Sequence, residues 1–322
     1  MIKLIRAGLT ALGIMLLASG SSVPALAQTN ATPGLTELRI GGFPGLPAAQ
    51  IYVGQDLGIF KKYGLEVTYT PLASGAVAAT AVLAGSLDLG LIDAAALGAA
   101  HLHNLPLLYV APGPMDTDRA PAITMMVKPD SPLRTGKDFN GKTVGCTAIK
   151  GMGTVAFAAW MDANGGDSKT LKLIEFPVQQ TIAAVANGTL DAGLTVEPFV
   201  TNGITSGQVR AIVLLKGGLR DFMLTGWAGD SAWLNNNAQT IAKFRAAVKE
   251  AGAIANQRPM RADVAAVIAK YTKMPVSLVS SLQYFTDFGD KLEARQIQPV
   301  IDASAKYGLI DKSFPATDVM FK

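Results

Sequence analysis

A glycine-containing turn in the middle of the chain has a composition that suits a negatively charged ligand group. It reads Lys150-Gly151-Met152-Gly153-Thr154 and lies between an apolar run and an alanine-rich stretch. Glycines let the main chain approach a ligand closely, and free amides at the start of a helix favour negative charge. Because Lys150 adds a mobile cation, we predict a cradle for a carboxylate, sulfonate or phosphate group. A tight turn with a solvated lysine is the alternative.

The same turn admits an enzymatic interpretation. Continued to Ala156, it fits the pattern G-x-G-x-x-A. Glu175 follows at about the spacing, roughly twenty residues, at which a dinucleotide-binding domain holds an acid for the ribose of its cofactor. An exported oxidoreductase is therefore an alternative. The position of the turn in mid-chain, rather than at the start of the fold, argues against it.

Three other turns join a predicted strand to a predicted helix in the first half of the chain. They carry Phe43-Pro44, Ser74-Gly75 and Asp93-Ala94. In open α/β sheets, ligands bind at the carboxyl ends of the strands, so we predict that these turns and residues 151–154 converge on one site. Phe43 would supply an apolar wall. Ser74 and Asp93 are equally suited to capping their helices, and that interpretation stays open.

The residues used most often in metal and nucleophilic chemistry are scarce. His101 and His103 are the only histidines and have no acidic residue close to them in sequence, whereas zinc sites usually take three or more protein ligands. The single cysteine, Cys146, ends an apolar run and is interpreted as a small buried hydrophobe. No G-x-S-x-G elbow occurs. We therefore expect no metal, no cofactor, no catalytic residue and no enzymatic activity.

Strands and helices alternate over the first two thirds of the chain. Alanine-rich stretches such as residues 75–84 and 154–163 predict helices, and from residue 238 to 307 the helical period dominates. The fold class is therefore α/β, with largely parallel, covered sheets and a helical C-terminal tail over them. The short apolar runs predicted as strands are residues 38–40, 65–70, 87–92, 107–111, 143–146, 171–176, 190–195 and 209–215.

A six-residue motif occurs twice. The sequence Gly85-Ser86-Leu87-Asp88-Leu89-Gly90 returns as Gly188-Thr189-Leu190-Asp191-Ala192-Gly193, and each copy follows an alanine-rich helix. Because glycine is common just past the end of a helix, each copy predicts a helix end followed by a strand. The repeat indicates two domains built alike, which agrees with a chain of more than 300 residues.

The N-terminal segment has the order of a secretory signal peptide. Lys3 and Arg6 precede an apolar stretch, residues 7–20, which leads to Ala25-Leu26-Ala27 before Gln28. The absence of a cysteine after this stretch and of an arginine pair before it disfavours lipidation and twin-arginine export. We expect residues 1–27 to be removed on the general secretory pathway, leaving a periplasmic protein that is not a lipoprotein, with a flexible segment at residues 28–35.

The charge of the remaining chain excludes one class of partner. Losing residues 1–27 removes Lys3 and Arg6 but no acid, so the net charge falls from +4 to +2. No cluster of lysines and arginines occurs, so nucleic-acid binding is not expected. We also expect the protein to be a monomer.

Five segments, in order along the chain, resemble the sulfonate/nitrate/taurine branch of ABC-transporter substrate-binding proteins, to which thiamine-pyrimidine precursor binders are related. The resemblance covers nearly all of the chain after residue 27. The segments are residues 48–67, with Gly58-Ile59-Phe60 and Tyr63-Gly64-Leu65-Glu66-Val67; residues 83–88; residues 127–144, with Lys128-Pro129-Asp130-Ser131-Pro132 and Asn140-Gly141-Lys142; residues 187–192; and Glu197-Pro198.

The resemblance implies a type II periplasmic binding protein fold, in which two crossover strands join two lobes. It places the crossings near residues 123–128 and 222–228. Lobe 1 then comprises residues 36–122 and 229–322, and lobe 2 comprises residues 123–228. The resemblance also implies binding without catalysis, with a small molecule and the membrane permease of an ABC importer as partners.

Carried over by position, the family's ligand contacts fall on the turns described above and add two residues. They are Phe43, Pro44, Ser74, Gly75, Asp93, Ala94, Gly151, Met152, Gly153, Thr154, Gln179 and the neighbourhood of Glu197. Because its carboxylate would repel an anion, Glu197 either supports the hinge or reads a cationic or hydrogen-bonding ligand.

None of these turns contains an arginine, so the bidentate fork that recognises carboxylates and sulfonates firmly is missing. We predict a small anionic organic solute, sulfonate-, nitrate- or carboxylate-like, between the lobes. A neutral or cationic heterocycle such as a thiamine-pyrimidine precursor is the alternative.

Overall fold

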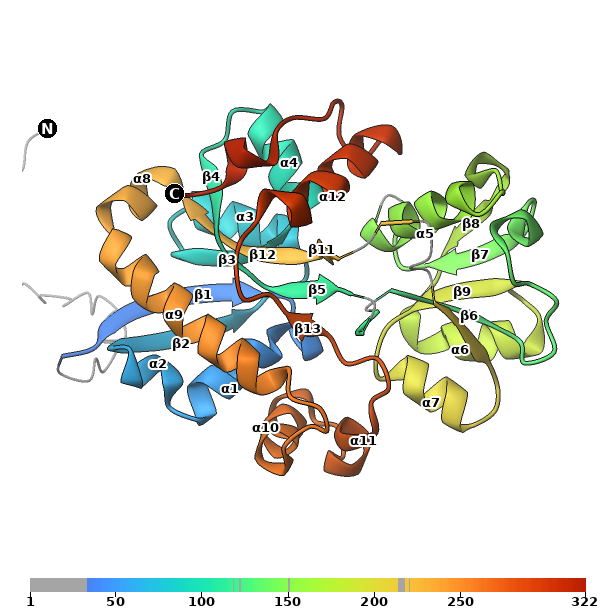
Figure 1. Ribbon diagram of the computed structural model, residues 1–322, viewed down its shortest axis with the longest axis horizontal. Coiled ribbons are helices and arrows are strands. Elements are labelled where there is room, and N and C mark those ends of the chain that lie inside the picture. The colour runs from blue at the N-terminus through green and yellow to red at the C-terminus, as the bar shows by residue number, and fades with distance from the viewer. Residues whose placement is uncertain (1–33, 118, 122, 150, 214–217, 220) are drawn as a thin grey trace, which may run out of the picture.

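The computed structural model describes residues 34–117, 119–121, 123–149, 151–213, 218, 219 and 221–322. Two five-stranded sheets form two lobes that lie side by side, and a small three-stranded sheet lies between them (Figure 1). The predicted α/β fold with two lobes and a helical tail is confirmed. The sheets, predicted to be largely parallel, are instead mixed, because each five-stranded sheet has two parallel and two antiparallel strand pairs. The expected signal peptide, residues 28–33 and Lys150 lie outside the described residues.

The lobe 1 sheet has the strand order β2-β1-β3-β12-β4. Its strands are β1 (Thr36–Gly42), β2 (Leu65–Pro71), β3 (Leu89–Asp93), β4 (Leu107–Pro112) and β12 (Thr225–Asp230). β1 runs parallel to β2 and β3, whereas β12 is antiparallel to both of its neighbours. The residues between β4 and β12 contain the whole second lobe, so lobe 1 is discontinuous in sequence.

The lobe 2 sheet has the order β10-β6-β9-β7-β8. Its strands are β6 (Thr124–Val127), β7 (Thr143–Cys146), β8 (Lys172–Glu175), β9 (Ala192–Thr195) and β10 (Arg210–Val213). β7 is parallel to β8 and β9, and β6 is antiparallel to β9 and β10. Read from the opposite edge, this order repeats that of lobe 1, with β6 in the place of β12.

All eight predicted strands occur, but the two crossing segments differ from the expectation. Residues 123–128 form β6 inside the lobe 2 sheet, and most of residues 222–228 belong to β11 and β12. The predicted boundary after residue 228 therefore falls inside a strand of lobe 1. The strands that connect the lobes are β5 (Pro114–Asp116) and β11 (Phe222–Met223), which pair with each other; β13 (Asp287–Phe288) pairs with β5.

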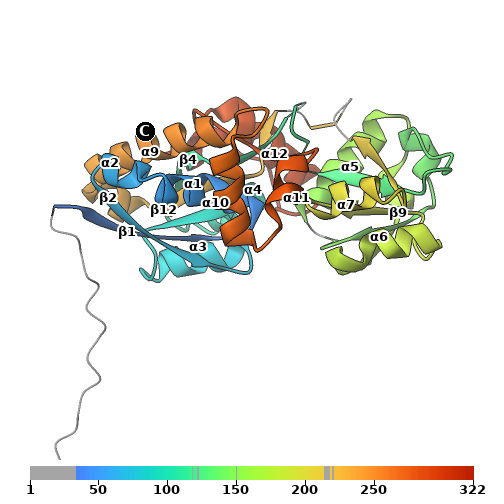
Figure 2. The same cartoon turned by 90° about the horizontal axis from the view of Figure 1, so that it is seen from below.

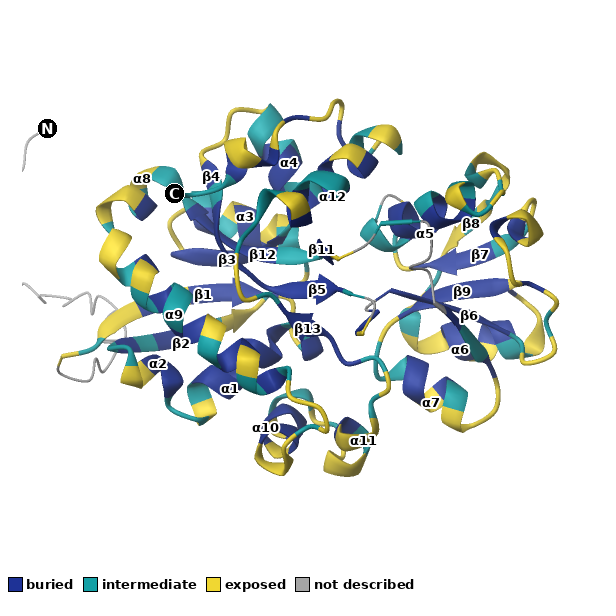
Figure 3. Ribbon diagram, in the orientation of Figure 1, coloured by how far each residue is buried: buried dark blue, intermediate teal, exposed yellow. Residues whose placement is uncertain are grey.

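Helices cover both faces of each sheet (Figure 2). In lobe 1, α1, α9 and α10 pack on one face, and α3, α4 and α12 on the other. In lobe 2, α5 packs on one face, and α6 and α7 on the other. The central strands β3, β6, β9 and β12 are buried along nearly their whole length, whereas the edge strand β8 is largely exposed (Figure 3). The helices are α1 (Ala49–Asp56), α2 (Ile59–Lys62), α3 (Gly75–Leu83), α4 (Ala94–Leu102), α5 (Met152–Ala163), α6 (Val178–Asn187), α7 (Phe199–Thr205), α8 (Ser231–Asn236), α9 (Ala238–Ala255), α10 (Ala262–Thr272), α11 (Val276–Ser281) and α12 (Ala294–Lys306).

The tail also reaches the second lobe. Tyr307 at the end of α12 donates a hydrogen bond from its hydroxyl to Asp162 Oδ2 on α5, at 2.7 Å. None of the helices in the described part of the chain has the length and apolarity of a membrane-spanning segment.

The repeated motif has the same structural task in both lobes. Gly85 and Gly188 follow helices with left-handed backbones, φ +70° and +84°, and the motifs then lead into β3 and β9. The amide of Asp88 donates to the Arg39 carbonyl, and its carboxylate accepts from the Arg39 amide at 2.7 Å. Asp191 makes the same pair of bonds with Thr143, at 3.0 and 2.9 Å. The motif therefore aligns a central strand with its parallel neighbour in each lobe.

We expect Asp88→Ala to lower the free energy of unfolding by about 1.5–3 kcal/mol, because its buried carboxylate also accepts from the Arg39 guanidinium. Asp191→Ala is expected to cost less, about 0.5–1.5 kcal/mol, because Asp191 is exposed. Urea denaturation of both variants measures the difference. Equal losses would contradict the role assigned to burial.

Candidate functional site

In lobe 1, two of the predicted turns meet. A Cβ added to Gly75 would lie 2.5 Å from Asp93 Oδ2 and 2.9 Å from the Asp93 amide, so only glycine permits this approach. The Ser74 hydroxyl accepts from the Val77 amide at 3.3 Å, and Asp93 Oδ1 accepts from the Ala96 amide at 2.8 Å. Both side chains therefore cap the helices that follow them, which was the alternative interpretation of these residues.

The turn after β1 presents an aromatic side chain to solvent. Phe43 is 52% exposed, although it follows a strand whose last residues are buried. Its carbonyl accepts from the Tyr69 hydroxyl at 2.8 Å, and the amide of Gly45 donates to the Tyr52 hydroxyl at 3.2 Å. The sequence gives no local signal for these two tyrosines, because they come from α1 and β2.

In lobe 2, α5 begins without a side-chain cap. Gly151 is its N-cap and supplies no acceptor, in contrast to Ser74 and Asp93. The Thr154 hydroxyl turns back and donates to the Ala148 carbonyl at 2.8 Å. A Cβ at Gly153 would meet nothing closer than Leu194 Cδ1 at 3.8 Å, so packing within the described chain does not require glycine there.

The starts of α4 and α5 lie on the same side of the molecule. Ala94 belongs to a hydrophobic cluster otherwise formed mainly by lobe 2, against which Met152 packs. Val300 of α12 is part of the same cluster, and the Ser304 hydroxyl lies 3.9 Å from Met152 Sδ. The tail thus holds the two turns near each other. Gln179 lies exposed in the first turn of α6.

Glu197 joins lobe 2 to the tail. Its Oε2 accepts from the Thr201 amide at 3.0 Å, and its Oε1 accepts from the Thr201 hydroxyl at 2.7 Å and from the Tyr284 amide at 3.0 Å. The Gln283 amide donates to the Thr201 hydroxyl at 3.0 Å. Both carboxylate oxygens are thus occupied by partners from two parts of the chain, an arrangement that favours hinge support over ligand reading.

The loops after the strands are apolar and acidic. Among the described residues, seven large apolar side chains are exposed, and four of them follow carboxyl ends of strands in one lobe or the other. These four are Phe43, Val77, Ile149 and Val196. The charged side chains described at carboxyl strand ends are Asp93 at the end of β3, Glu175 at the end of β8 and Glu197 after β9. The Glu175 carboxylate accepts from the Ile149 amide at 3.1 Å.

The cysteine and one histidine lie in packing positions, and the other histidine is exposed. Cys146 is 2% exposed at the end of β7, and burial raises the pKa of its thiol. His101 lies on α4 with its ring 4.3 Å from that of Phe314, and His103 is the exposed C-cap of α4. Within the described ranges, no three His, Cys, Asp or Glu side chains gather where they could hold a metal ion.

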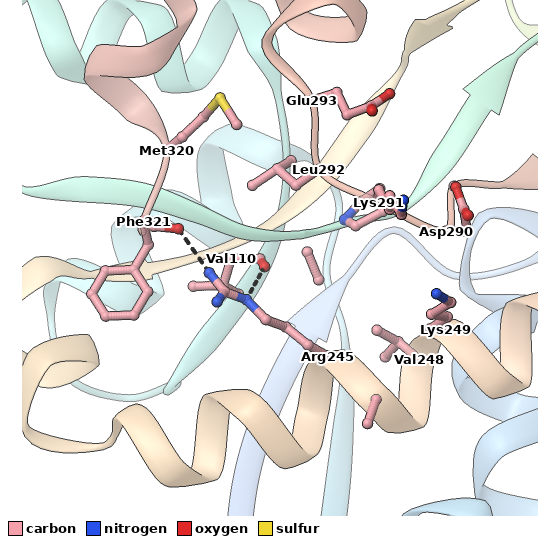
Figure 4. Close-up of a pocket in the computed structure, with 14 residues that line it drawn as sticks. Val110, Arg245, Val248, Lys249, Asp290, Lys291, Leu292, Glu293, Met320 and Phe321 are labelled. Carbon is pink, nitrogen blue, oxygen red and sulfur yellow. Dashed lines mark hydrogen bonds between the residues drawn. The ribbon is translucent and has the colours of Figure 1, made fainter.

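A cavity of about 540 Å³ lies elsewhere in lobe 1, over β4 and between α9 and the chain that follows β13. Figure 4 shows Arg245 reaching from α9 across this cavity, where its guanidinium donates to the carbonyls of Val110 and Phe321, both at 2.7 Å. Burial lowers the pKa of this guanidinium. Arg245 thus fastens the C-terminal residues to β4, and none of the predicted ligand residues lines the cavity.

A smaller cavity of about 310 Å³ lies in lobe 2, beside Lys128, Lys142 and Asp191. Lys142 and Asp191 precede β7 and β9, and Lys128 follows β6, which is antiparallel to β9, so all three lie opposite the turns that begin α5 and α7. It is therefore remote from the predicted ligand residues as well.

Two α/β lobes with matching strand orders, joined by paired connecting strands, form the periplasmic binding protein fold. The model of the NMT1/THI5-like family matches residues 47–262, more than half of the chain, so the chain belongs to the NMT1/THI5-like family. The sequence has no significant match among curated proteins.

Solved structures share the fold at low sequence identity. The periplasmic aliphatic sulphonate binding protein SsuA from Escherichia coli superposes with a TM-score of 0.72 and 20% identity, covering 88% of this chain and 97% of that one. The alkanesulfonate-binding protein SsuA from Xanthomonas axonopodis, bound to MOPS, gives 0.68 and 18% over 90% and 99%. The nitrate-binding protein NrtA from Synechocystis gives 0.66 and 15% over 89% and 85%.

We expect Glu197→Gln to lower the free energy of unfolding by about 1–3 kcal/mol, because an amide offers one acceptor oxygen where the carboxylate uses two. Thr201→Val, which removes the hydroxyl partner, should lower it similarly. Thermal melts measure the loss. A Glu197→Gln protein that keeps its melting temperature but no longer binds a ligand would assign the carboxylate to the ligand instead.

Proposed function

We propose that this protein is the periplasmic solute-binding component of an ABC importer and binds a small anionic organic solute between its lobes without converting it. The family and the two-lobed fold support the binding function. The permease as partner, the monomeric state and export by the general secretory pathway are part of the same proposal. They rest on the N-terminal sequence and on the kinship with ABC binding proteins.

The observation that carries the proposal is the uncapped start of α5. Its first amides receive no acceptor from the N-cap residue. A Cβ at Gly153 would meet no atom closer than 3.8 Å, whereas Gly151 already lies close to Ala148. Amides at a helix N-terminus, together with the helix dipole, stabilise an anion. α3 and α4 already use a side-chain oxygen at this position, whereas the starts of α5 and α6 do not, so the α5 amides can donate to a carboxylate, sulfonate or nitrate group.

The rest of the ligand is apolar in this proposal. Phe43 on lobe 1 and Ile149 and Val196 on lobe 2 expose large apolar surfaces beside the turns. Burying such surface in the bound state contributes roughly 25 cal/mol per Å². An organic anion therefore matches these loops better than a bare inorganic ion.

A specific observation favours a second candidate, a neutral or cationic heterocycle. The described charges on these loops are the carboxylates of Asp93, Glu175 and Glu197, which raise the energy of a bound anion and lower that of a cation. In the described part of the chain, no lysine or arginine on these loops offsets them. Lys150 would be the opposing cation.

The oxidoreductase interpretation has less support. β7, α5 and β8 form a parallel βαβ unit, and Glu175 contacts the loop that follows β7. However, β6 is antiparallel to β9 and β10, so the sheet differs from the parallel sheet of a dinucleotide-binding domain.

The test is a thermal-shift and calorimetric screen of the mature protein against MOPS, taurine, nitrate, acetate and cytosine. A ligand at a hundred times its dissociation constant should stabilise the protein by about 2.7 kcal/mol. For a sulfonate that binds, Gly153→Val should weaken affinity at least tenfold, because the larger side chain obstructs the approach to the amides. A tenfold loss of affinity corresponds to about 1.4 kcal/mol of binding free energy. Near-native affinity in a folded Gly153→Val protein would refute the α5 cradle, and Cys146→Ser serves as the control.

Asp93→Asn separates the two ligand classes. Asparagine keeps the oxygen that caps α4, so the fold is retained while one negative charge is removed. Affinity for an anion should rise on the order of threefold at low salt, and affinity for a cation should fall by a similar factor. A fall for every bound ligand would favour the cationic heterocycle and refute the anion.

A further inference from the structure

The turn that carries Phe43 contains a backbone conformation that is stabilised by residues outside the turn. Gly45 has φ +94° and ψ −149°, a region populated almost only by glycine. A Cβ at this position would meet no neighbouring atom, so the backbone angles, rather than crowding, account for the glycine. A glycine in an open loop has many alternative conformations, and ordering it carries an entropic cost.

Two tyrosine hydroxyls bracket this glycine. Tyr69 on β2 donates to the Phe43 carbonyl at 2.8 Å, and Tyr52 on α1 accepts from the Gly45 amide at 3.2 Å. One bond fixes Phe43, three residues before the start of the short helix at Leu46, and the other fixes Gly45, just before it. The backbone on each side of Pro44 is therefore fixed by the core of lobe 1.

The two rings are themselves immobilised. Tyr52 is 4% exposed and packs edge-to-face on Tyr69, with ring centroids 5.8 Å apart. Tyr271 of α10 stacks on the other side of Tyr52, at 4.3 Å and an interplanar angle of 2°, and its hydroxyl donates to Asp56 Oδ1 at 2.7 Å. Burial raises the pKa of the Tyr52, Tyr69 and Tyr271 hydroxyls, so they stay protonated at neutral pH.

The hydrogen bonds that fix this turn leave the Phe43 side chain unburied in the free protein. Its side chain is half exposed, whereas of the two tyrosines that hold the turn, Tyr52 is buried and Tyr69 is partly buried. Anchoring an exposed aromatic side chain in one position lowers the ordering cost of any molecule that packs on it. The simplest function of such a side chain is to form an apolar wall of the ligand site that is already in position before the ligand binds.

We propose that Tyr52 and Tyr69 are positioning residues of the interlobe ligand site, which set the Phe43 turn in its binding conformation without touching the ligand. This inference rests on the proposed function, since it requires a ligand that packs on Phe43. The rings of Tyr52, Tyr69 and Tyr271 form one aromatic cluster, so the position of a loop in the site depends on a helix of the tail.

The test uses Tyr52→Phe and Tyr69→Phe in the mature protein, because phenylalanine keeps the ring stack and removes only the hydroxyl. Tyr63→Phe is the matched control: it deletes a hydroxyl that donates to Glu250 Oε2 at 2.8 Å in the same lobe, far from the turn. Hydrogen exchange of the Gly45 amide, followed by NMR without ligand, reports on the turn directly. Exchange should accelerate about three- to tenfold in both variants and remain unchanged in the control.

Affinity is then measured by calorimetry with MOPS and with cytosine, one probe for each candidate ligand class. For the probe that binds the wild type, both variants should bind about three- to tenfold more weakly, and the control should match the wild type. Melting temperatures are recorded for all four proteins. A lower melting temperature with unchanged affinity would reduce the tyrosines to a structural role and overturn the proposal.

Two further outcomes are distinguishable. If exchange at Gly45 is the same in all four proteins, the tyrosines do not hold the turn, and the inference fails whatever the ligand is. If the turn loosens but the wild type binds neither MOPS nor cytosine, and no other compound of the screen binds it, the proposed function fails and the positioning role falls with it.

Discussion

Each five-stranded sheet is completed by a strand that the chain inserts as it passes between the lobes. β5 leads into β6, which lies between β9 and β10, and β11 leads into β12, which lies between β3 and β4. Main-chain donors and acceptors in a buried sheet must be paired, so neither lobe can complete its sheet without the crossing segment. The connection between the lobes is therefore anchored in both sheets, with the short β5–β11 pair between them.

The tail adds constraints on two sides of this connection. β13 pairs with β5, the segment before β13 is bonded to Glu197 and Thr201 at the start of α7, and the end of α12 is bonded to Asp162 on α5. Asp287 on β13 also receives the Arg119 guanidinium at 2.9 and 2.8 Å. The C-terminal tail therefore does more than cover lobe 1. It sets the relative position of the lobes, and with it the distance between the turns that start α4 and α5.

The electrostatics of the proposed site depend on which group, if any, accepts hydrogen bonds from the first amides of each helix. α3 and α4 are capped by their own Ser74 and Asp93, whereas α5 begins at a glycine. An uncapped N-terminus and three nearby carboxylates act in opposite directions on an anion. The balance between them, together with the apolar surface of Phe43, Ile149 and Val196, decides which class of solute the loops prefer.

The sequence alone determined the features that depend on neighbouring residues. Apolar runs bounded by turn residues located eight strands, and the glycine at each motif copy located the helix ends before β3 and β9. It also located the turns at Ser74, Asp93 and Gly151, because helix starts have local signatures. The tertiary structure decided the rest. β5, β11 and β13 are two or three residues long, too short for any period to be visible, and β6 and β12 found their places through partners in strands far along the chain. Glu197 meets Tyr284 across 87 residues, and Phe43 is held by tyrosines whose own surroundings include a residue of α10. Such partners are chosen by packing between distant segments, for which a local pattern carries no information.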